Sequence, residues 1–109
     1  MKAQFEVWRF NFPDKGEHPV VLISHTDFCA RAVVNVLYCT SQRQSRALKP
    51  YEVLLDGADG MDWETFCDCS VMYAVPAACL FGKRGRVDAK RRDAIRDKVR
   101  DVFRLSARG

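Results

Sequence analysis

The chain has 109 residues and a mass of 12.5 kDa, with 48% hydrophobic and 29% charged residues, so we expect one globular domain over residues 1–109 and exclude a disordered chain. No apolar run approaches the roughly 20 residues that cross a bilayer, and the N-terminus lacks the apolar stretch of a secretory signal, which excludes a membrane-spanning helix and predicts a cytoplasmic protein. The net charge of +4 is uneven, because residues 1–80 carry 7 Lys and Arg against 10 Asp and Glu, whereas residues 81–109 carry 11 against 4.

The N-terminal part of the chain is predicted to form strands. Aromatic and β-branched residues alternate with polar ones over 4–10, which is typical of a half-buried strand. Residues 11–17 hold a proline and a glycine among polar residues and are predicted to be a loop. Residues 19–24 are a continuous apolar run opened by Pro19, which indicates a strand buried on both faces.

A short helical turn is expected next, over 25–32, with Thr26 or Asp27 as its cap and Phe28 packed inward. The strand predicted over 33–40 is largely apolar on both faces. Such a strand belongs in the centre of a sheet, where neighbours cover it from both sides.

The middle of the chain alternates loops with strands. Residues 41–49 are polar and basic and are predicted to be an exposed loop, which leads to a short strand over 52–55. Glycines and aspartates make 56–60 a turn, and a further turn is expected over 62–66. Alternation predicts a strand over 67–75 whose odd-numbered side chains share one face.

The C-terminal part ends in a helix. A short strand is expected over 80–81, and Asp88 then precedes a helix over about 89–105. Apolar residues recur on one face of that helix at Ile95, Val99, Val102 and Leu105. Several strands followed by one amphipathic helix, without alternation of strand and helix, predict a mainly β member of the α+β class built on an antiparallel sheet or barrel.

The five cysteines are an odd number, which favours free thiols in a reducing compartment over a disulfide framework. Cys67 and Cys69 form a C-x-C pair, and no second closely spaced pair is present, so no zinc site is expected. Free cysteines on strands are interpreted as small core residues.

Polar residues at the ends of central strands are the remaining candidates for chemistry. The glycines match neither a phosphate-binding loop nor a dinucleotide-binding motif, and no G-x-S-x-G serine elbow is present. His18 precedes the second predicted strand, and Thr40 and Ser41 end the third, so these residues share one rim if the two strands are neighbours. A histidine beside a hydroxyl can transfer a proton at a phosphodiester whose charge is bound by arginine or lysine. The alternative is a surface histidine and a strand-ending threonine.

Four segments resemble the MazF/PemK toxin family, and they occur in the family's order. They are GEHPVVLIS (16–24), VNVLYCTSQ (34–42), PYEVLL (50–55) and RGRVDAKRRDAI (84–95). The resemblance implies a small SH3-like antiparallel barrel of the CcdB/PemK type with a C-terminal helix, and a homodimer. It also implies an endoribonuclease that cuts single-stranded RNA at specific sequences, uses no metal or other cofactor, leaves a 2′,3′-cyclic phosphate and is neutralised by an antitoxin.

Two positions can be compared with the family's active site. Thr40 falls where the family has its active-site threonine, whereas His18 stands before the proline where the family has its catalytic arginine. Either His18 takes over as acid or base, with Arg43 supplying charge, or the site is silent and the fold acts as a protein-binding module. The candidate RNA-contacting residues are Ser41, Arg43, Arg46, Lys49, Lys15 and Trp8.

The related CcdB toxins share the barrel and poison gyrase through an aromatic and aliphatic C-terminal tip. Residues 106–109 lack such a tip, so gyrase poisoning is the weakest of the three interpretations. The basic segment 81–109 would attract an acidic antitoxin tail, although a solvated helix face explains its charge equally well.

Overall fold

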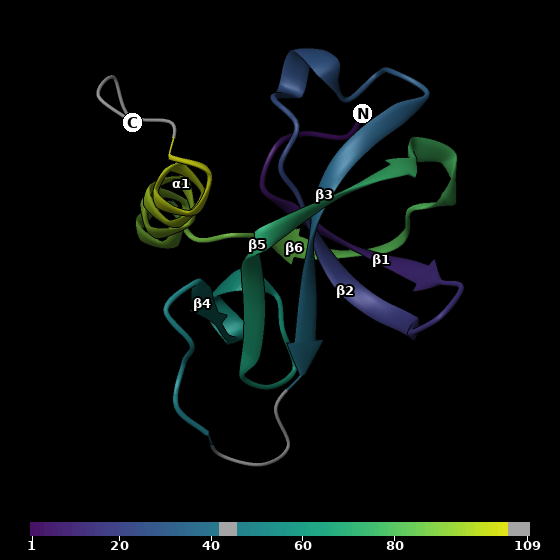
Figure 1. Cartoon of the computed structure of the whole chain (residues 1–109). Helices are drawn as coiled ribbons and strands as arrows, with labels where there is room; N and C mark the ends of the chain where they lie inside the picture. Colours follow the sequence, from purple (N-terminus) through teal and green to yellow (C-terminus); the bar gives the residue numbers. More distant parts are fainter. Residues whose placement is uncertain (42–45, 105–109) are drawn as a thin grey trace.

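A computed structural model describes residues 1–41 and 46–104. Its six strands are β1 (Glu6–Phe12), β2 (Gly16–Leu22), β3 (Val33–Ser41), β4 (Glu52–Leu55), β5 (Thr65–Pro76) and β6 (Phe81–Arg86). They form one antiparallel sheet in the order β4-β5-β3-β2-β1-β6, curled into a half-barrel (Figure 1). Helix α1 (Ala89–Phe103) packs against β4 and β5. The predicted fold class, a mainly β domain with a C-terminal helix, is confirmed.

The predicted loop over 11–17 is wrong. Strand β1 continues to Phe12 and β2 begins at Gly16, so the turn between them covers only 13–15. Phe12 is buried and packs edge-on against Phe10 at 4.8 Å between ring centroids. This aromatic packing stabilises an extended backbone up to Phe12, so the proline signal marks only the tight turn that follows. His18 is therefore the third residue of β2 and lies inside the strand.

The sheet buries apolar residues in two separate clusters. The first, which we call the helix-side cluster, joins the sheet to Ile95 and Val99 of α1 and includes Val21, Leu37 and Cys67. The second, which we call the aromatic cluster, has a buried centre that includes Phe12, Val20, Leu22, Val36 and Val75, with Trp8, Phe10, Tyr38 and Tyr73 packed around it. Strands β2 and β3 contribute to both clusters, which agrees with their prediction as central strands.

Strand β5 passes from one cluster to the other, and the prediction that its odd-numbered side chains share one face is wrong. Cys67 and Cys69 lie in the helix-side cluster, whereas Tyr73 and Val75 lie in the aromatic cluster. Between them Val71 is 45% exposed. The pairing of β5 with β3 shifts register in this region, and such a bulge turns the following side chains to the other face.

Several element boundaries differ from the sequence prediction. The helical turn is a single 3-10 turn, Thr26–Phe28, and its cap is the side chain of His25, which accepts a hydrogen bond from the Asp27 backbone N–H at 3.2 Å. Phe28 is 49% exposed, so its predicted inward packing is wrong. The strand predicted over 52–55 is confirmed as β4, whereas the other strands are shifted or longer than predicted, most clearly β6, which covers Phe81–Arg86 rather than two residues. Helix α1 ends at Phe103, where Arg104 adopts a left-handed backbone with a φ of +52°, so the end predicted near residue 105 is about two residues too late.

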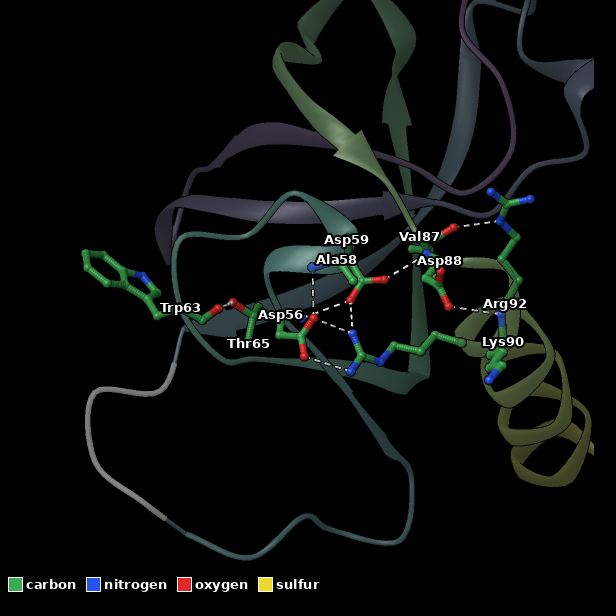
Figure 2. Close-up of polar contacts among 10 residues, drawn as sticks. Asp56, Ala58, Asp59, Trp63, Thr65, Val87, Asp88, Lys90 and Arg92 are labelled. Atoms are coloured by element: carbon green, nitrogen blue, oxygen red, sulfur yellow. Dashed lines mark hydrogen bonds and ion pairs between the residues drawn. The ribbon is translucent and has the colours of Figure 1, made fainter.

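Arg91 of α1 clamps the turn that follows β4. Its Nη1 and Nη2 donate to the two carboxylate oxygens of Asp56 at 2.7 and 2.8 Å, and Nη1 also donates to Asp59 (Figure 2). The fully buried Asp59 carboxylate also accepts from the backbone N–H groups of Asp56 and Asp88, at 2.9 and 2.7 Å. A buried charge needs this degree of pairing. The hydrogen bonds from Arg91 lower the pKa of Asp56 to about 2.

The same turn packs closely on β6. Gly60 closes it with a φ of +90°, and a Cβ atom at this position would lie 2.5 Å from the backbone oxygen of Arg84. Only glycine accommodates both the left-handed backbone and this approach. The close contact fixes the segment after Gly60 against the end of β6.

Candidate functional site

His18 lies where strands β2 and β3 part. The backbone ladder joins Val20 to Tyr38 and continues to Leu22 and Val36. At the end of the ladder, the His18 side chain bridges the strands, with Nδ1 3.2 Å from the Cys39 carbonyl oxygen. The expected rim is therefore present, since β2 and β3 are neighbours and bring His18 to the C-terminal end of β3.

The imidazole of His18 has partners on both ring nitrogens. Nε2 lies 3.0 Å from the Lys15 carbonyl oxygen and 3.2 Å from the Tyr38 hydroxyl. Carbonyl oxygens only accept hydrogen bonds, so the doubly protonated ring can donate to both Cys39 and Lys15. The neutral ring with its proton on Nδ1 donates to Cys39 and uses Nε2 to accept from Tyr38. In that tautomer the 3.0 Å contact of Nε2 with the Lys15 carbonyl oxygen has no proton to share, so the position of the ring protons decides which of these contacts are hydrogen bonds.

Tyr38 supports the histidine from β3. Its ring centroid lies 4.7 Å from that of His18, and its ring also packs edge-on against Phe12 at 5.3 Å. Burial raises the pKa of Tyr38, so the hydroxyl stays protonated at neutral pH and remains able to donate. The aromatic cluster thus holds the Tyr38 hydroxyl beside Nε2.

Thr40 is a half-buried residue of β3, next to the residue whose carbonyl contacts His18. It lies directly opposite Phe66 of β5 in the ladder. Cys39 points into the helix-side cluster, so Thr40 points to the other side of β3 by the alternation of a strand. His18 and Thr40 are brought to the same end of the sheet.

A pocket of about 270 Å³ opens beside His18, and we call it the rim pocket. Its walls come from β1, β2, the end of β3, the segment before β5, the first residue of β5, and β6. The lining residues are Arg9, Glu17, His18, Pro19, Ser41, Met61, Asp62, Trp63, Thr65 and Arg84.

The charges of the rim pocket are paired. Arg9 Nε lies 3.1 Å from the Glu17 carboxylate, and Arg84 forms an ion pair with Asp62. Arg9 lies opposite Pro19 in the hairpin, so an arginine from the neighbouring strand stands beside the residue that follows His18. The two ion pairs leave the pocket polar and close to neutral when His18 is uncharged.

The other predicted RNA-contacting residues are distributed around this end of the sheet. Ser41 lines the rim pocket, and Lys15 supplies the carbonyl that faces His18 while its Nζ pairs with Asp14 at 3.2 Å. Arg46 stacks on Phe66, which faces Thr40, at 4.2 Å from guanidinium carbon to ring centroid.

Both nitrogens Nη1 and Nη2 of Arg46 are held by the buried Glu52 carboxylate at 2.8 Å, and the backbone N–H of Lys49 donates to the same carboxylate. Hydrogen bonding by Arg46 lowers the pKa of Glu52. Neither Lys49 nor Trp8 lines the rim pocket; Trp8 packs on the aromatic cluster and its indole N–H donates to Glu6 at 3.2 Å. Arg43 lies outside the described residues.

Sequence reasoning missed several residues of this region. Tyr38 could have been found, because it lies two positions before Thr40 on the same strand, and side chains two apart share a face. Arg9, Asp62 and Arg84 carry no such signal. They meet only through the β1–β2 register and the packing of the turn at Gly60 on β6.

Within the described ranges, no three His, Cys, Asp or Glu side chains are grouped so that they could hold a metal ion. All five cysteines are free, and four of them are buried, as small core residues are expected to be. Over the same ranges no helix has the length and apolar character needed to cross a membrane.

The fold and the strand-end site define a small β half-barrel whose candidate residues are His18 and Thr40. The chain belongs to the family of PemK-like, MazF-like toxins of type II toxin–antitoxin systems, whose family model matches residues 3–103. A comparison with curated protein sequences found no match.

Solved structures show the same fold at low sequence identity. One is an endoribonuclease in complex with its cognate antitoxin from a mycobacterial species, with a TM-score of 0.82, 16% identity, and coverage of 97% of this chain and 98% of that chain. Another is the Mycobacterium tuberculosis toxin MazF-mt6, with a TM-score of 0.79, 19% identity, and coverage of 93% and 98%. A third is a MazE–MazF structure from Deinococcus radiodurans, with a TM-score of 0.69, 15% identity, and coverage of 94% of each chain.

Proposed function

We propose that this protein is a toxin endoribonuclease that cleaves single-stranded RNA at specific sequences without a metal ion. The observation that carries the proposal is the placement of His18, in a chain of the MazF-like family, between the Cys39 carbonyl and the Tyr38 hydroxyl and near Thr40. The named similar structures include an endoribonuclease, which supports the reaction class.

His18 acts as the general base in the first half of the reaction. With its proton on Nδ1 and donated to Cys39, the neutral ring has its one lone pair on Nε2. The ribose 2′-OH displaces Tyr38 as the donor to that nitrogen when the substrate binds. The 2′-oxygen attacks the phosphorus as its proton moves to Nε2. The bond from phosphorus to the 5′-oxygen breaks, and the His18 imidazolium returns the proton to the leaving oxygen through a water molecule. The products are a 2′,3′-cyclic phosphate and a 5′-hydroxyl, and the histidine is neutral again.

Hydroxyl groups around His18 assist this step. Thr40 donates to a non-bridging oxygen of the scissile phosphate, with Ser41 and Arg43 assisting, so that the charge gained by the phosphorane is stabilised. The protonated Tyr38 hydroxyl orients Nε2 before substrate binds. Histidine holds at most half of the contacts of the arginine fork that it replaces, so a nearby arginine must bind the remaining phosphate charge.

The proposed partners are single-stranded RNA, a second copy of the chain in a homodimer, and a cognate antitoxin. Two of the named similar structures contain an antitoxin or are described as MazE–MazF. An acidic antitoxin segment would be attracted to the basic residues of α1 and β6. The cytoplasm is the compartment that provides RNA and a reducing environment for the free thiols.

The test is incubation of the purified protein with a long unstructured RNA in EDTA. We expect cleavage at a few short sequences and products that end in a cyclic phosphate. The variants His18→Ala and Thr40→Ala should lower the rate by about 10²- to 10⁴-fold. His25→Ala is the matched control, because His25 is exposed and caps a turn away from the pocket.

The second candidate is a catalytically silent member of the family that binds a protein partner. It is favoured by the replacement of the family's arginine by His18 and by the pairing of Arg46 with Glu52. Absence of cleavage by a folded wild-type protein would establish this candidate and refute the enzyme. A rate unchanged in His18→Ala would refute the role of the histidine.

A further inference from the structure

We propose that the rim pocket binds one unpaired RNA base and thereby sets the sequence at which the RNA is bound. The inference rests on the proposed function, because it takes RNA as the ligand of this end of the sheet. It assigns a role to Arg9, Glu17, Asp62, Trp63 and Arg84, none of which belongs to the His18 and Thr40 pair.

The charge of the pocket favours a base over a phosphate. Two arginines meet two carboxylates, as Arg9 with Glu17 and Arg84 with Asp62. A phosphate entering here would gain two cations but would also face two anions at close range, and like charges repel. A neutral polar ring meets no such repulsion. The phosphate therefore belongs at His18 and Thr40, and the neutral part of the nucleotide belongs in the rim pocket.

The size and walls of the pocket fit a planar ring. Its volume of about 270 Å³ lies just below the roughly 300–1,000 Å³ of pockets for drug-sized ligands, so it accommodates one base and no longer stretch of RNA. Trp63 lines the pocket and its side chain is 54% exposed. Stacking of unpaired bases on aromatic rings is the usual way in which proteins hold single-stranded RNA.

The polar groups of the pocket can distinguish one base from another. Carboxylates accept hydrogen bonds from the exocyclic amino groups of bases, and guanidinium groups donate to their ring nitrogens and carbonyl oxygens. Two contacts hold the Arg84 side chain: Nε donates to the Gly60 carbonyl oxygen at 3.4 Å, and the guanidinium forms an ion pair with Asp62. Groups held in this way present a fixed pattern of donors and acceptors, and a fixed pattern is what base selection requires.

The pocket also lies where an adjacent nucleotide would reach it. His18 is both a lining residue of the pocket and the proposed base of the reaction, so the pocket opens beside the reacting atoms. A base bound in the pocket would thus belong to a nucleotide next to the scissile phosphate. His18 would therefore contact both the selected base and the scissile group.

The experiment uses the full chain and a randomised pool of short single-stranded RNA with 2′-O-methyl groups, which removes the attacking hydroxyl and prevents cleavage. The bound fraction is sequenced for the wild type, Asp62→Asn and Glu17→Gln. Each substitution keeps the shape of the side chain and replaces an acceptor oxygen by a donor. The matched control is Glu64→Gln, a change of the same type at an exposed carboxylate that does not line the pocket.

We expect the wild type and Glu64→Gln to enrich one base at one position. Asp62→Asn or Glu17→Gln should change the preference at that position by about tenfold while leaving thermal unfolding unchanged. Trp63→Ala should weaken binding to all sequences, and Trp63→Phe should restore much of it because a phenyl ring still stacks.

Three results would overturn the proposal: no base enriched by the wild type, the same preference in all pocket variants, or no RNA retained at all. Cleavage of unmodified RNA is measured in parallel and tests the proposed function separately. A wild type that selects a base without cutting refutes the enzyme and keeps the pocket, whereas one that cuts with a preference indifferent to the pocket variants refutes only the pocket.

Discussion

The Arg91 clamp and the His18 site are both polar networks that join segments distant in sequence. They differ in whether the hydrogen-bonding capacity of their charged or titratable groups is fully used. In the clamp, Arg91 meets two carboxylates, and the buried Asp59 also accepts two backbone N–H groups. At the other site, the two ring nitrogens of the half-buried His18 face three partners, namely the Cys39 and Lys15 carbonyl oxygens and the Tyr38 hydroxyl. A saturated network holds structure, whereas a network whose hydrogen bonds depend on the position of a ring proton can perform proton transfer.

Arg91→Ala is the substitution expected to disturb stability most. It leaves the buried Asp59 carboxylate without its cation, and removal of one partner of a buried pair typically costs about 3–5 kcal/mol; we expect about 2–4 kcal/mol, because Arg91 is itself partly exposed. Urea unfolding gives the free energy directly. Lys90→Ala is the matched control, since Lys90 is exposed on the same helical turn and its backbone, not its side chain, contacts Asp88. Equal stability of the two variants would contradict the comparison.

The clamp also supports the rim pocket, because Asp56 and Asp59 precede the segment that carries Asp62 and Trp63. In Arg91→Ala at a temperature where the protein stays folded, RNA binding should weaken together with stability. The His18 site is built on other strands and needs no contact with Arg91.

Tyr38→Phe tests whether the Tyr38 hydroxyl contributes to the reaction at the His18 site. It removes the hydroxyl that lies 3.2 Å from Nε2 and retains the ring that packs on the histidine. We expect kcat to fall by about tenfold, the cost of one hydrogen bond to a reacting group, with KM almost unchanged and the dependence of the rate on pH altered.

The control for this variant is Tyr73→Phe. Tyr73 belongs to the same aromatic cluster, and its ring centroid lies 6.2 Å from that of Tyr38. The substitution also removes a phenolic hydroxyl, but among the described residues the Tyr73 side chain has no contact with His18. A kcat that is lowered equally in both variants would show that the cluster responds to any lost hydroxyl and that Tyr38 has no specific role.

Acid should weaken the clamp through Asp56. The pKa of this carboxylate is about 2 in the folded protein, below its ordinary value of 3.8, because Arg91 donates hydrogen bonds to it. A lowered pKa contributes stability that is fully present above pH 3.8 and is lost as the pH falls toward 2. The melting temperature, followed from pH 6 to pH 2, should fall less in Asp56→Asn than in the wild type. An identical slope for both proteins would contradict this assignment.

Much of the fold was accessible from the sequence, and the reason is local. Period-2 alternation and β-branched runs identified the strands, and the spacing of Ile95, Val99 and Val102 identified the helix. Errors arose where packing outweighed local signals. Strand β1 extends to Phe12, inside the predicted loop, because Phe12 packs in the core. In β5 a register shift places Cys69 and Tyr73 on opposite faces of the strand.

The candidate site divides in the same way. His18 and Thr40 were found because each stands at a motif position of the family, and the sheet brings them to one end as expected for neighbouring strands. Their roles stay predictions until the cleavage assay is done. The ion pairs of Arg9 and Arg84 were not predictable, because their partners lie on elements whose register and packing a single sequence does not reveal.

The sequence by itself determined the class of fold, the order of most elements, the family and the identity of the histidine that replaces an arginine. Tertiary structure alone decided which groups surround that histidine, which charges are saturated, and where a pocket opens. The physical reason is the range of the forces involved. Backbone propensity and side-chain alternation act over a few neighbouring residues, whereas hydrogen bonds and ion pairs require atoms about 3 Å apart, a condition that only the folded chain can meet for residues distant in sequence.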